Sequence, residues 1–202
     1  MNSQVKLSLA STNQGKLREY QVLAQEVDPA ADLRLLSAIG IIEEFEEDAP
    51  TFAENALGKA LHYSKTSKEI VFADDSGLVV PALGGEPGVR SARYAGTNAS
   101  SAERIEKLLN EMAAKKGADR AAYFVCVIAV ARAGRALAIV SDRVDGEILD
   151  ATRGTRGFGY DPVFYLPEMR KSFAELSMEE KNRFSHRGKA FRRLLSVLTD
   201  ML

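Results

Sequence analysis

Strand and helix patterns alternate along the first third of the chain, and this alternation limits the fold more than any other feature. Apolar and polar residues alternate over residues 5–9, as in a half-buried strand. Apolar residues then recur at helical spacing over residues 14–27, and short strand patterns follow at residues 33–36 and 70–73. A second helix, expected over residues 51–67, separates these two strands. Alternation of this kind predicts an α/β fold.

Two Ser/Thr-x-x-Glu patterns mark the starts of helices. Thr51 with Glu54 opens the helix over residues 51–67, and Ser100 with Glu103 opens a helix that we expect to reach Lys116. Both patterns are capping boxes, in which the two side chains bond the free N–H groups of the first turn.

The second half of the chain adds a hairpin. Residues 120–132 and 135–144 are rich in Val, Ile, Ala, Phe and Tyr, and Ala133-Gly134 suits the turn between them. An antiparallel hairpin beside parallel strands predicts a mixed sheet flanked by helices. Residues 188–202 read as a final packing helix. Because the chain has no repeat or linker pattern, we expect one domain over residues 1–202.

The charge balance excludes some function classes. The chain has 202 residues, with 27 Lys plus Arg against 28 Asp plus Glu and a formal net charge of −1. This argues against the strongly basic surface of a general nucleic-acid-binding protein. No apolar run approaches the roughly 18 residues of a membrane span, and residues 1–10 lack the apolar core of a signal peptide. The single cysteine, Cys126, cannot form an internal disulfide, so we expect a reducing, cytoplasmic location.

Residues 11–16, Ser-Thr-Asn-Gln-Gly-Lys, follow the first strand at the start of the first helix. A helix N-terminus offers free N–H groups and a positive dipole end, and Lys16 adds a charge, so this turn suits a phosphate group. It is not a Walker A loop, which would need Gly at Ala10 and Ser or Thr at Leu17. The alternative is that Asn13 only caps the helix and that Lys16 extends into solvent.

Two acidic clusters are candidates for metal binding. Five carboxylates fall within residues 43–48, although most such runs are solvated loops. Asp74 and Asp75 follow a buried strand, where we expect Ser76 and Gly77 to turn the chain at the edge at which open α/β sheets bind ligands. Carboxylates placed there suit Mg²⁺. The alternative is an Asx-turn in which one Asp caps the next element.

Two further clusters suit a planar ligand. Residues 157–162, Gly-Phe-Gly-Tyr-Asp-Pro, place Phe158 and Tyr160 between glycines, where either ring can stack on a base. The alternative is a tight turn whose aromatic rings lie at the edge of a core. Near the last helix, His186 and Arg187 can donate hydrogen bonds to a carbonyl-bearing ring or to phosphates.

Other kinds of site are disfavoured. Cys126 lies within a strand pattern, and no serine occupies a nucleophile-elbow pattern. One cysteine and two separated histidines cannot supply a zinc site, and His62, within a helix, is expected to be structural. The remaining carboxylates, cations, glycines and aromatics suit a metal-assisted attack of water on a phosphate anhydride.

Six motifs in these clusters occur together and in a fixed order. They are S-T-N-Q-G-K at 11–16, T-F-x-E-N-A-x-x-K at 51–59, A-D-D-S-G at 73–77, G-G-x-P-G-V-R-S-A-R-Y at 84–94, G-F-G-Y-D-P at 157–162 and A-E-L-x-x-x-E-K-N-x-x-S-H-R-G at 174–188. In this order, over nearly the whole chain, they resemble the inosine/xanthosine triphosphate pyrophosphatases, enzymes of non-canonical purine nucleotides. The resemblance implies hydrolysis of ITP, dITP or XTP to the monophosphate and pyrophosphate, which cleanses the nucleotide pool.

The resemblance also implies an architecture and a set of site residues. It implies an elongated mixed sheet, a nucleotide cleft between two lobes, Mg²⁺ as cofactor and a homodimer. Asp75, Lys16 and Lys59 would be catalytic, and Glu46 and Asp75 would bind the metal. The residues that would contact the substrate are Ser11, Thr12, Asn13, Gln14, Gly15, Lys16, Ser76, Phe158, Gly159, Tyr160, Asp161, Lys181, His186 and Arg187.

Two physical expectations accompany these roles. The negative charge of Asp74 would raise the pKa of Asp75, although Mg²⁺ would act in the opposite direction. Donors from His186, Arg187 and the backbone of residues 158–161 would pair with the carbonyl at ring position six of hypoxanthine or xanthine and would oppose the amino group of adenine.

The chain departs from the family at Asp142, where relatives often have glycine; this bears on the local strand or dimer geometry. The capping box already gives Glu54 a structural role, and whether Glu54 or Asp74 also contacts the metal stays open. Two other functions remain open: a Maf-like nucleotide pyrophosphatase acting on other bases, and a sensor that binds nucleotide without cleaving it. The motif over residues 185–188 argues against the first, and the presence of all the expected carboxylates argues against the second.

Overall fold

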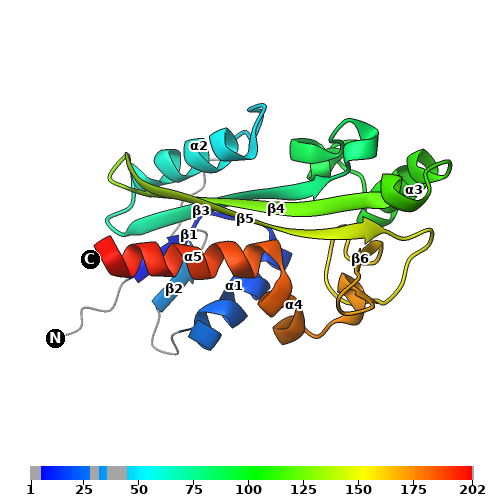
Figure 1. The fold of residues 1–202 in the computed structure, drawn as a ribbon. Helices are drawn as coiled ribbons and strands as arrows, with labels where there is room; N and C mark the ends of the chain where they lie inside the picture. Colours follow the sequence, from blue (N-terminus) through cyan, green and yellow to red (C-terminus); the bar gives the residue numbers. More distant parts are fainter. Residues whose placement is uncertain (1–5, 28–31, 36–44, 202) are drawn as a thin grey trace. The chain divides into compact units, whose positions relative to one another are not determined.

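The computed structural model describes residues 6–27, 32–35 and 45–201 (Figure 1). Within them, seven strands form one sheet in the order β2-β1-β3-β4-β5-β6-β7. The strands are β1 (Lys6–Leu9), β2 (Asp32–Leu35), β3 (Ile70–Val79), β4 (Ala121–Arg132), β5 (Arg135–Ile148), β6 (Phe164–Leu166) and β7 (Lys171–Ser172). The helices are α1 (Gln14–Val27), α2 (Phe52–Ser64), α3 (Ser101–Met112), α4 (Met178–Phe184) and α5 (His186–Met201).

The sheet is mixed, as predicted. β1 runs parallel to β2 and β3, and Leu7 pairs with Leu33 and Ile70. β6 runs antiparallel to both β5 and β7. The predicted hairpin is confirmed: Ala133 and Gly134 join β4 to β5 with φ values of 50° and 75°, the left-handed conformation that a tight two-residue hairpin turn requires. The chain therefore has the predicted α/β fold.

The chain divides into two compact units. Unit 1 contains the described residues within 1–75, 126–142 and 187–202, and unit 2 contains residues 76–125 and 143–186. β3, β4 and β5 each contribute residues to both units. The single domain with two lobes and a nucleotide cleft stays a prediction.

Unit 1 packs its helices on both faces of its strands, with α1 and α5 on one face and α2 on the other (Figure 1). The ring of Tyr20 on α1 meets the rings of Phe72 and Phe191 edge-on, each at a centroid distance of 5.3 Å. All three side chains are buried, so they fix α1 and α5 against β3. Because α5 packs through Phe191, Leu194 and Leu198, the predicted final packing helix is confirmed.

Unit 2 has a separate core. The ring of Phe164 lies 4.7 Å from that of Phe124 and 4.9 Å from that of Phe173, and Leu108 and Met112 of α3 belong to the same cluster. The capping box at the start of α3 is confirmed in full: the Ser100 side chain accepts from Glu103 N, and the Glu103 carboxylate accepts from Ser100 N.

One prediction about β3 is wrong. The strand does not end in a turn at residues 74–77, nor does an Asp cap a new element there; it continues to Val79. Asp74, Asp75 and Gly77 are buried within the strand, which continues through the buried Leu78. The strand can continue because lysines and an arginine from elsewhere in the sequence lie next to these aspartates. Their positive charges offset the cost of burying a carboxylate.

Other boundaries differ by a few residues. α2 ends at Ser64 and α3 at Met112, each a few residues before the expected end, while α5 begins at His186, slightly earlier than expected. Val5, residues 36 and 43–44, and Leu202, which entered the predictions, lie outside the described residues. Among the helices that the structure describes, none combines the length and the apolar character needed to cross a membrane.

Candidate active site

The turn at residues 11–16 joins β1 to α1, as predicted. The Oγ atom of Ser11 accepts a hydrogen bond from Asn13 N at 3.2 Å, and Asn13 Oδ1 accepts one from Lys16 N at 3.1 Å. Asn13 therefore caps α1, while Thr12, Asn13 and Gln14 stay exposed. Because these residues are exposed, a phosphate group can reach the turn. Phosphate binding by the turn stays a prediction.

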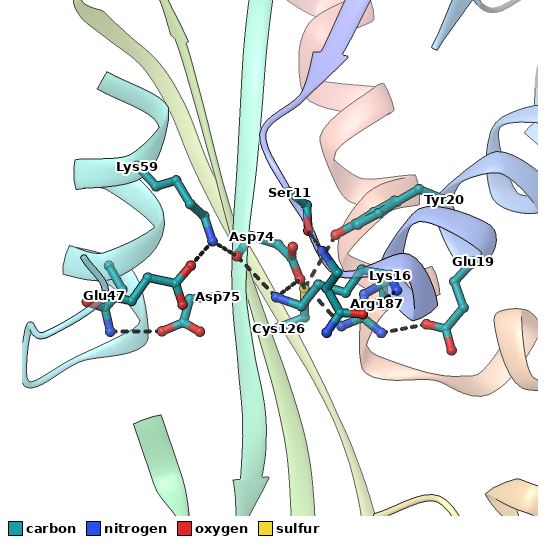
Figure 2. A network of polar contacts seen from close by, with 12 residues as sticks. Ser11, Lys16, Glu19, Tyr20, Glu47, Lys59, Asp74, Asp75, Cys126 and Arg187 are labelled. Carbon is teal, nitrogen blue, oxygen red and sulfur yellow. Dashed lines mark hydrogen bonds and ion pairs between the residues drawn. The ribbon is translucent and has the colours of Figure 1, made fainter. Parts of the chain in front are cut away.

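Two lysines converge on the backbone carbonyl of Asp74 (Figure 2). Lys16 does not extend into solvent; its Nζ lies 3.3 Å from the Asp74 carbonyl oxygen and 3.1 Å from Oδ2 of the same residue. Lys59 on α2 donates to the same carbonyl at 2.9 Å and also pairs with Glu47. The two ammonium groups reach β3 from helices on its opposite faces, which concentrates positive charge beside Asp75.

The carboxylate of Asp74 is fully buried in unit 1. Oδ2 lies 3.1 Å from Lys16 Nζ, 3.4 Å from Arg187 Nη2 and 3.9 Å from the sulfur of Cys126. Burial alone would raise the pKa of Asp74, but the charges of Lys16, Arg187 and Lys59 hold it well below its ordinary value. Asp74 is therefore a fixed negative charge, while burial raises the pKa of Cys126 to about 12 and leaves that thiol inert.

Asp75 points to the opposite side of β3, because successive side chains of a strand alternate (Figure 2). Its Oδ2 accepts a hydrogen bond from Asn55 Nδ2 at 2.9 Å, and the side chain is 5% exposed. Burial raises the pKa of Asp75 to about 6, helped by the charge of Glu47 and opposed by Lys16 and the Asn55 hydrogen bond. Glu47 is therefore one carboxylate whose charge raises this pKa, while the effect expected from Asp74 stays a prediction.

The described part of the acidic run, residues 45–48, lies beside α2. Glu47 is half-buried against Lys59, whereas Glu46 is exposed. Among the described residues, no group of three or more His, Cys, Asp or Glu is arranged to hold a metal ion. Asp75 near the charge of Glu47 still fits Mg²⁺, which needs only one or two protein carboxylates and takes its other ligands from water and phosphate. The assignment of Glu46 and Asp75 as the metal ligands stays a prediction.

Arg187 lies in the interior of unit 1. Its side chain is 2% exposed, and its guanidinium contacts Glu19 at 2.5 Å and Asp74 at 3.4 Å. Sequence reasoning missed Glu19, which lies on α1 168 positions from its partner. The available signal was its place beside Tyr20 and four residues before Leu23, at the edge of the apolar face of the helix. A buried acid at that position indicates a buried cation elsewhere in the chain.

In unit 2, a carboxylate organises the glycine-aromatic loop. Asp161 Oδ2 accepts a hydrogen bond from Phe158 N at 2.8 Å and pairs with Lys181 Nζ at 2.5 Å. Lys181 Nζ also lies 4.9 Å from the centre of the Phe158 ring. Gly157 has φ +75°, and a Cβ there would lie 2.0 Å from Asp161 Oδ2, so a side chain at this position would displace the carboxylate.

The two aromatic residues of this loop differ. Tyr160 is buried and donates its hydroxyl hydrogen to the Ser91 carbonyl at 2.9 Å, as in the core-edge alternative. Phe158 and Gly159 are only partly buried, so Phe158 is the ring placed to meet a ligand. The two rings, Lys181 and Asp161 all belong to unit 2, together with the half-buried Ser76.

The two histidines lie in different settings. His186 is 4% exposed, and its ring stacks on that of Phe124 at 4.8 Å with an interplanar angle of 10°. His62 lies on α2 between the rings of Phe45 and Tyr63, at 5.7 and 4.9 Å, which agrees with its expected structural role.

Unit 2 also contains a hollow of about 650 Å³ beside this loop. One wall is α3, with Ile105 and Leu109, and the other is the segment over residues 152–162, with Arg156 and Phe158. Phe158 therefore lines this hollow and is placed to contact a ligand bound in it.

Comparisons with known proteins agree with the family resemblance that the six motifs indicate. A model of the Ham1 family matches residues 7–197. The chain belongs to the Ham1 family. The Ham1 assignment is supported by a protein named dITP/XTP pyrophosphatase from Desulfotalea psychrophila, 52% identical over 90% of this chain and 80% of that protein. A protein of the same name from Thermus thermophilus is 46% identical over 97% of this chain and 93% of its own. The structure of a HAM1 protein from Coxiella burnetii aligns with TM-score 0.85 and 42% identity, covering 98% of this chain and all of that one.

Proposed function

We propose that this Ham1 chain hydrolyses non-canonical purine nucleoside triphosphates, namely ITP, dITP and XTP, to the monophosphate and pyrophosphate. The relatives that carry the name dITP/XTP pyrophosphatase align over nearly the whole chain and support this assignment. The observation that carries it is the convergence of Lys16 and Lys59 on β3 beside Asp75, whose pKa is raised to about 6. Cations that bind phosphate next to a carboxylate that can take a proton are what this reaction needs.

Water attacks the α-phosphorus, the bond to the oxygen bridging the α- and β-phosphates breaks, and pyrophosphate leaves. Lys16, Lys59 and the N–H groups of residues 11–15 bind the triphosphate and stabilise the charge that grows on the leaving group. Asp75 takes the proton from the attacking water. A pKa of about 6 leaves its carboxylate mainly ionised at pH 7 but basic enough to accept that proton.

Glu46 and Asp75 would hold Mg²⁺, which when bound supplies charge neutralisation and a lowered pKa for water. The hard oxygen ligands of the acidic segment and of Asp75 support this assignment. The homodimer is likewise our proposal and rests on the resemblance of the motifs. The cytoplasmic location is also a proposal, and it rests on the single cysteine, which cannot form an internal disulfide.

Base choice is assigned to residues of the last two motifs. Phe158 would stack on the purine, and donors from His186, Arg187, Lys181 and the loop over residues 158–161 would favour a carbonyl at ring position six. The exposure of Phe158, compared with the burial of Tyr160, supports stacking on the first ring. Ser76 would contact the substrate next to Asp75.

A panel of nucleoside triphosphates tests the proposal. ITP, dITP, XTP, ATP, GTP, dUTP and dTTP are incubated separately with the protein and Mg²⁺, and both pyrophosphate and orthophosphate are measured. We expect pyrophosphate from the first three at rates well above the others. Orthophosphate alone would indicate cleavage at the terminal phosphate, preference for dUTP or dTTP would indicate the Maf-like alternative, and binding without turnover would indicate the sensor.

A further inference from the structure

The acidic segment over residues 45–49 packs against one face of α2. The ring of Phe45 lies so close to Gly58 that a Cβ there would be 2.6 Å from Phe45 Cζ. The Tyr63 hydroxyl lies 3.3 Å from Phe45 N, and Lys59 pairs with Glu47. Lys59 and Tyr63 share a face because they lie one helical turn apart, and Gly58 is the neighbour of Lys59.

Asn55, one turn before Lys59 on this face, makes the remaining contacts. Its side-chain amide forms a two-sided pair with the backbone of Ala49: Oδ1 accepts from Ala49 N at 2.9 Å, and Nδ2 donates to Ala49 O at 3.3 Å. The same Nδ2 donates to Asp75 Oδ2 at 2.9 Å. The residue is 1% exposed, so water does not compete for these bonds.

We propose that Asn55 is a positioning residue that fixes the carboxylate of Asp75 relative to the acidic segment 45–49. This inference rests on the proposed function, in which Asp75 takes the proton and the acidic segment supplies a metal ligand. One side chain joins the two parts, because the amide uses its acceptor and one donor on the segment and its other donor on the carboxylate.

Only an amide of this length satisfies all three contacts. Aspartate has nearly the same volume, but it places oxygen where Nδ2 donates, so it faces both the Ala49 carbonyl and the Asp75 carboxylate with an acceptor. Alanine removes every contact and leaves the Asp75 oxygen and the Ala49 backbone without this partner. The local fold of α2 does not depend on the side chain, since Asn55 N donates to Thr51 O as any helical residue would.

A purely structural role is the competing explanation, and a matched control separates the two. Thr51 caps the same helix and is exposed, and its hydroxyl accepts a hydrogen bond from Glu54 N and donates one to the Glu54 carboxylate. Thr51→Ala therefore weakens α2 at its start without altering the Asn55 contacts. Effects seen with Asn55→Ala and Asn55→Asp but not with Thr51→Ala arise from the side-chain contacts rather than from helix stability.

The experiment measures three quantities for wild type, Asn55→Ala, Asn55→Asp and Thr51→Ala: kcat and KM for ITP, the Mg²⁺ concentration for half-maximal rate, and hydrogen exchange of the Ala49 amide in the metal-free protein. For both Asn55 variants we expect kcat to fall by about 10- to 100-fold, as for residues that orient a metal ligand, with KM changed less than kcat. We also expect a higher half-saturating Mg²⁺ concentration. For Asn55→Ala, Ala49 exchange should become faster.

Unchanged Ala49 exchange in Asn55→Ala, an unchanged Mg²⁺ requirement, or an equal loss of kcat in Thr51→Ala would each overturn the inference. If Asn55→Ala does not fold, Asn55→Asp decides by the same kinetic criteria, because it keeps the volume of the side chain. The proposed function fails separately, through absence of pyrophosphate release by wild-type protein; the exchange of the Ala49 amide then decides the positioning role alone.

Discussion

The guanidinium of Arg187 lies 3.4 Å from the carboxylate of Asp74, although the two residues are 113 positions apart and both are buried. Arg187 also holds Glu19, so one cation serves two interior carboxylates. This contact joins the last helix to the middle of β3 at the residue whose carbonyl oxygen receives Lys16 and Lys59. Changes at Arg187 should therefore affect both stability and the site.

Arg187→Ala should destabilise the protein by about 3–5 kcal/mol, because it leaves Glu19 and Asp74 as buried charges without their shared cation. It should also reduce the preference for ITP over ATP. The free energy of unfolding is measured by urea titration, and kcat/KM is measured for both nucleotides. An unchanged ITP/ATP ratio would assign base selection to other residues, while unchanged stability would contradict the role of this ion cluster.

The lowered pKa of Asp74 leads us to expect that the protein loses stability in acid. The folded protein depresses the pKa of Asp74, because Lys16, Arg187 and Lys59 outweigh the effect of burial. The stabilisation is therefore fully present above the pKa of the unfolded chain, about 3.9, and is lost as the pH falls below that value towards the depressed folded pKa. Urea unfolding from pH 7 down to pH 2.5 should show this loss. Arg187→Ala should show a shallower loss, since one of the three charges is gone.

The pKa of Asp75 is shifted in the opposite direction, so its contribution to stability has the opposite dependence on pH. Burial and Glu47 raise its pKa to about 6, so the folded protein binds this proton more tightly than the unfolded chain does. The corresponding stabilisation is present below about pH 3.9 and is lost as the pH rises through about 6. Carboxyl ¹³C shifts of the metal-free protein measure this titration, and Mg²⁺ should move it to lower pH. Glu47→Gln should also lower it; an unchanged midpoint in that variant would exclude Glu47 as a cause.

Asp75→Asn should reduce kcat by about 10²–10⁴-fold without loss of folded structure, because the amide cannot accept the proton of the attacking water. Circular dichroism checks the fold, and pyrophosphate release from ITP gives the rate. A variant with the wild-type rate would remove Asp75 from the mechanism.

Removal of the metal, together with a substitution of Glu46, tests the proposed Mg²⁺ site. EDTA should abolish pyrophosphate release, and added Mg²⁺ should restore it. Glu46→Gln should raise the Mg²⁺ concentration needed for half-maximal rate by at least tenfold, as expected when a ligand is lost. Activity that persists in EDTA would show that neither Glu46 nor Asp75 acts through a metal, and an unchanged Mg²⁺ requirement in Glu46→Gln would move the ligand to another position.

The predictable part of this fold is the local part. The caps at Thr51 and Ser100, the helical spacing of Leu17 and Tyr20, and the hairpin at Ala133-Gly134 depend on residues close in sequence, so each was visible without the structure. The course of β3 was not. Carboxylates are disfavoured in strands, so Asp74 and Asp75 predict that the strand ends there.

The strand continues because the partners of these carboxylates come from distant segments. Lys16 lies 58 positions and Arg187 113 positions from Asp74, and Asn55 lies 20 positions from Asp75. No local pattern in the sequence indicates which distant cation will neutralise a given acid. For the same reason the sequence does not reveal the roles of Glu19 and Asn55, although both lie within segments that it correctly predicts to be helices.

The pair of Asp161 and Lys181 allows a test of the loop in unit 2. Asp161→Asn leaves the buried Lys181 ammonium without its carboxylate, and this should cost about 3–5 kcal/mol of stability. The double variant with Lys181→Met removes both charges and should be more stable than Asp161→Asn alone, since the second substitution removes the unpaired ammonium. Urea unfolding of wild type, both single variants and the double variant measures this coupling. A double variant no more stable than Asp161→Asn would show that the ammonium is compensated by other groups and that Asp161 holds the loop through Phe158 N alone.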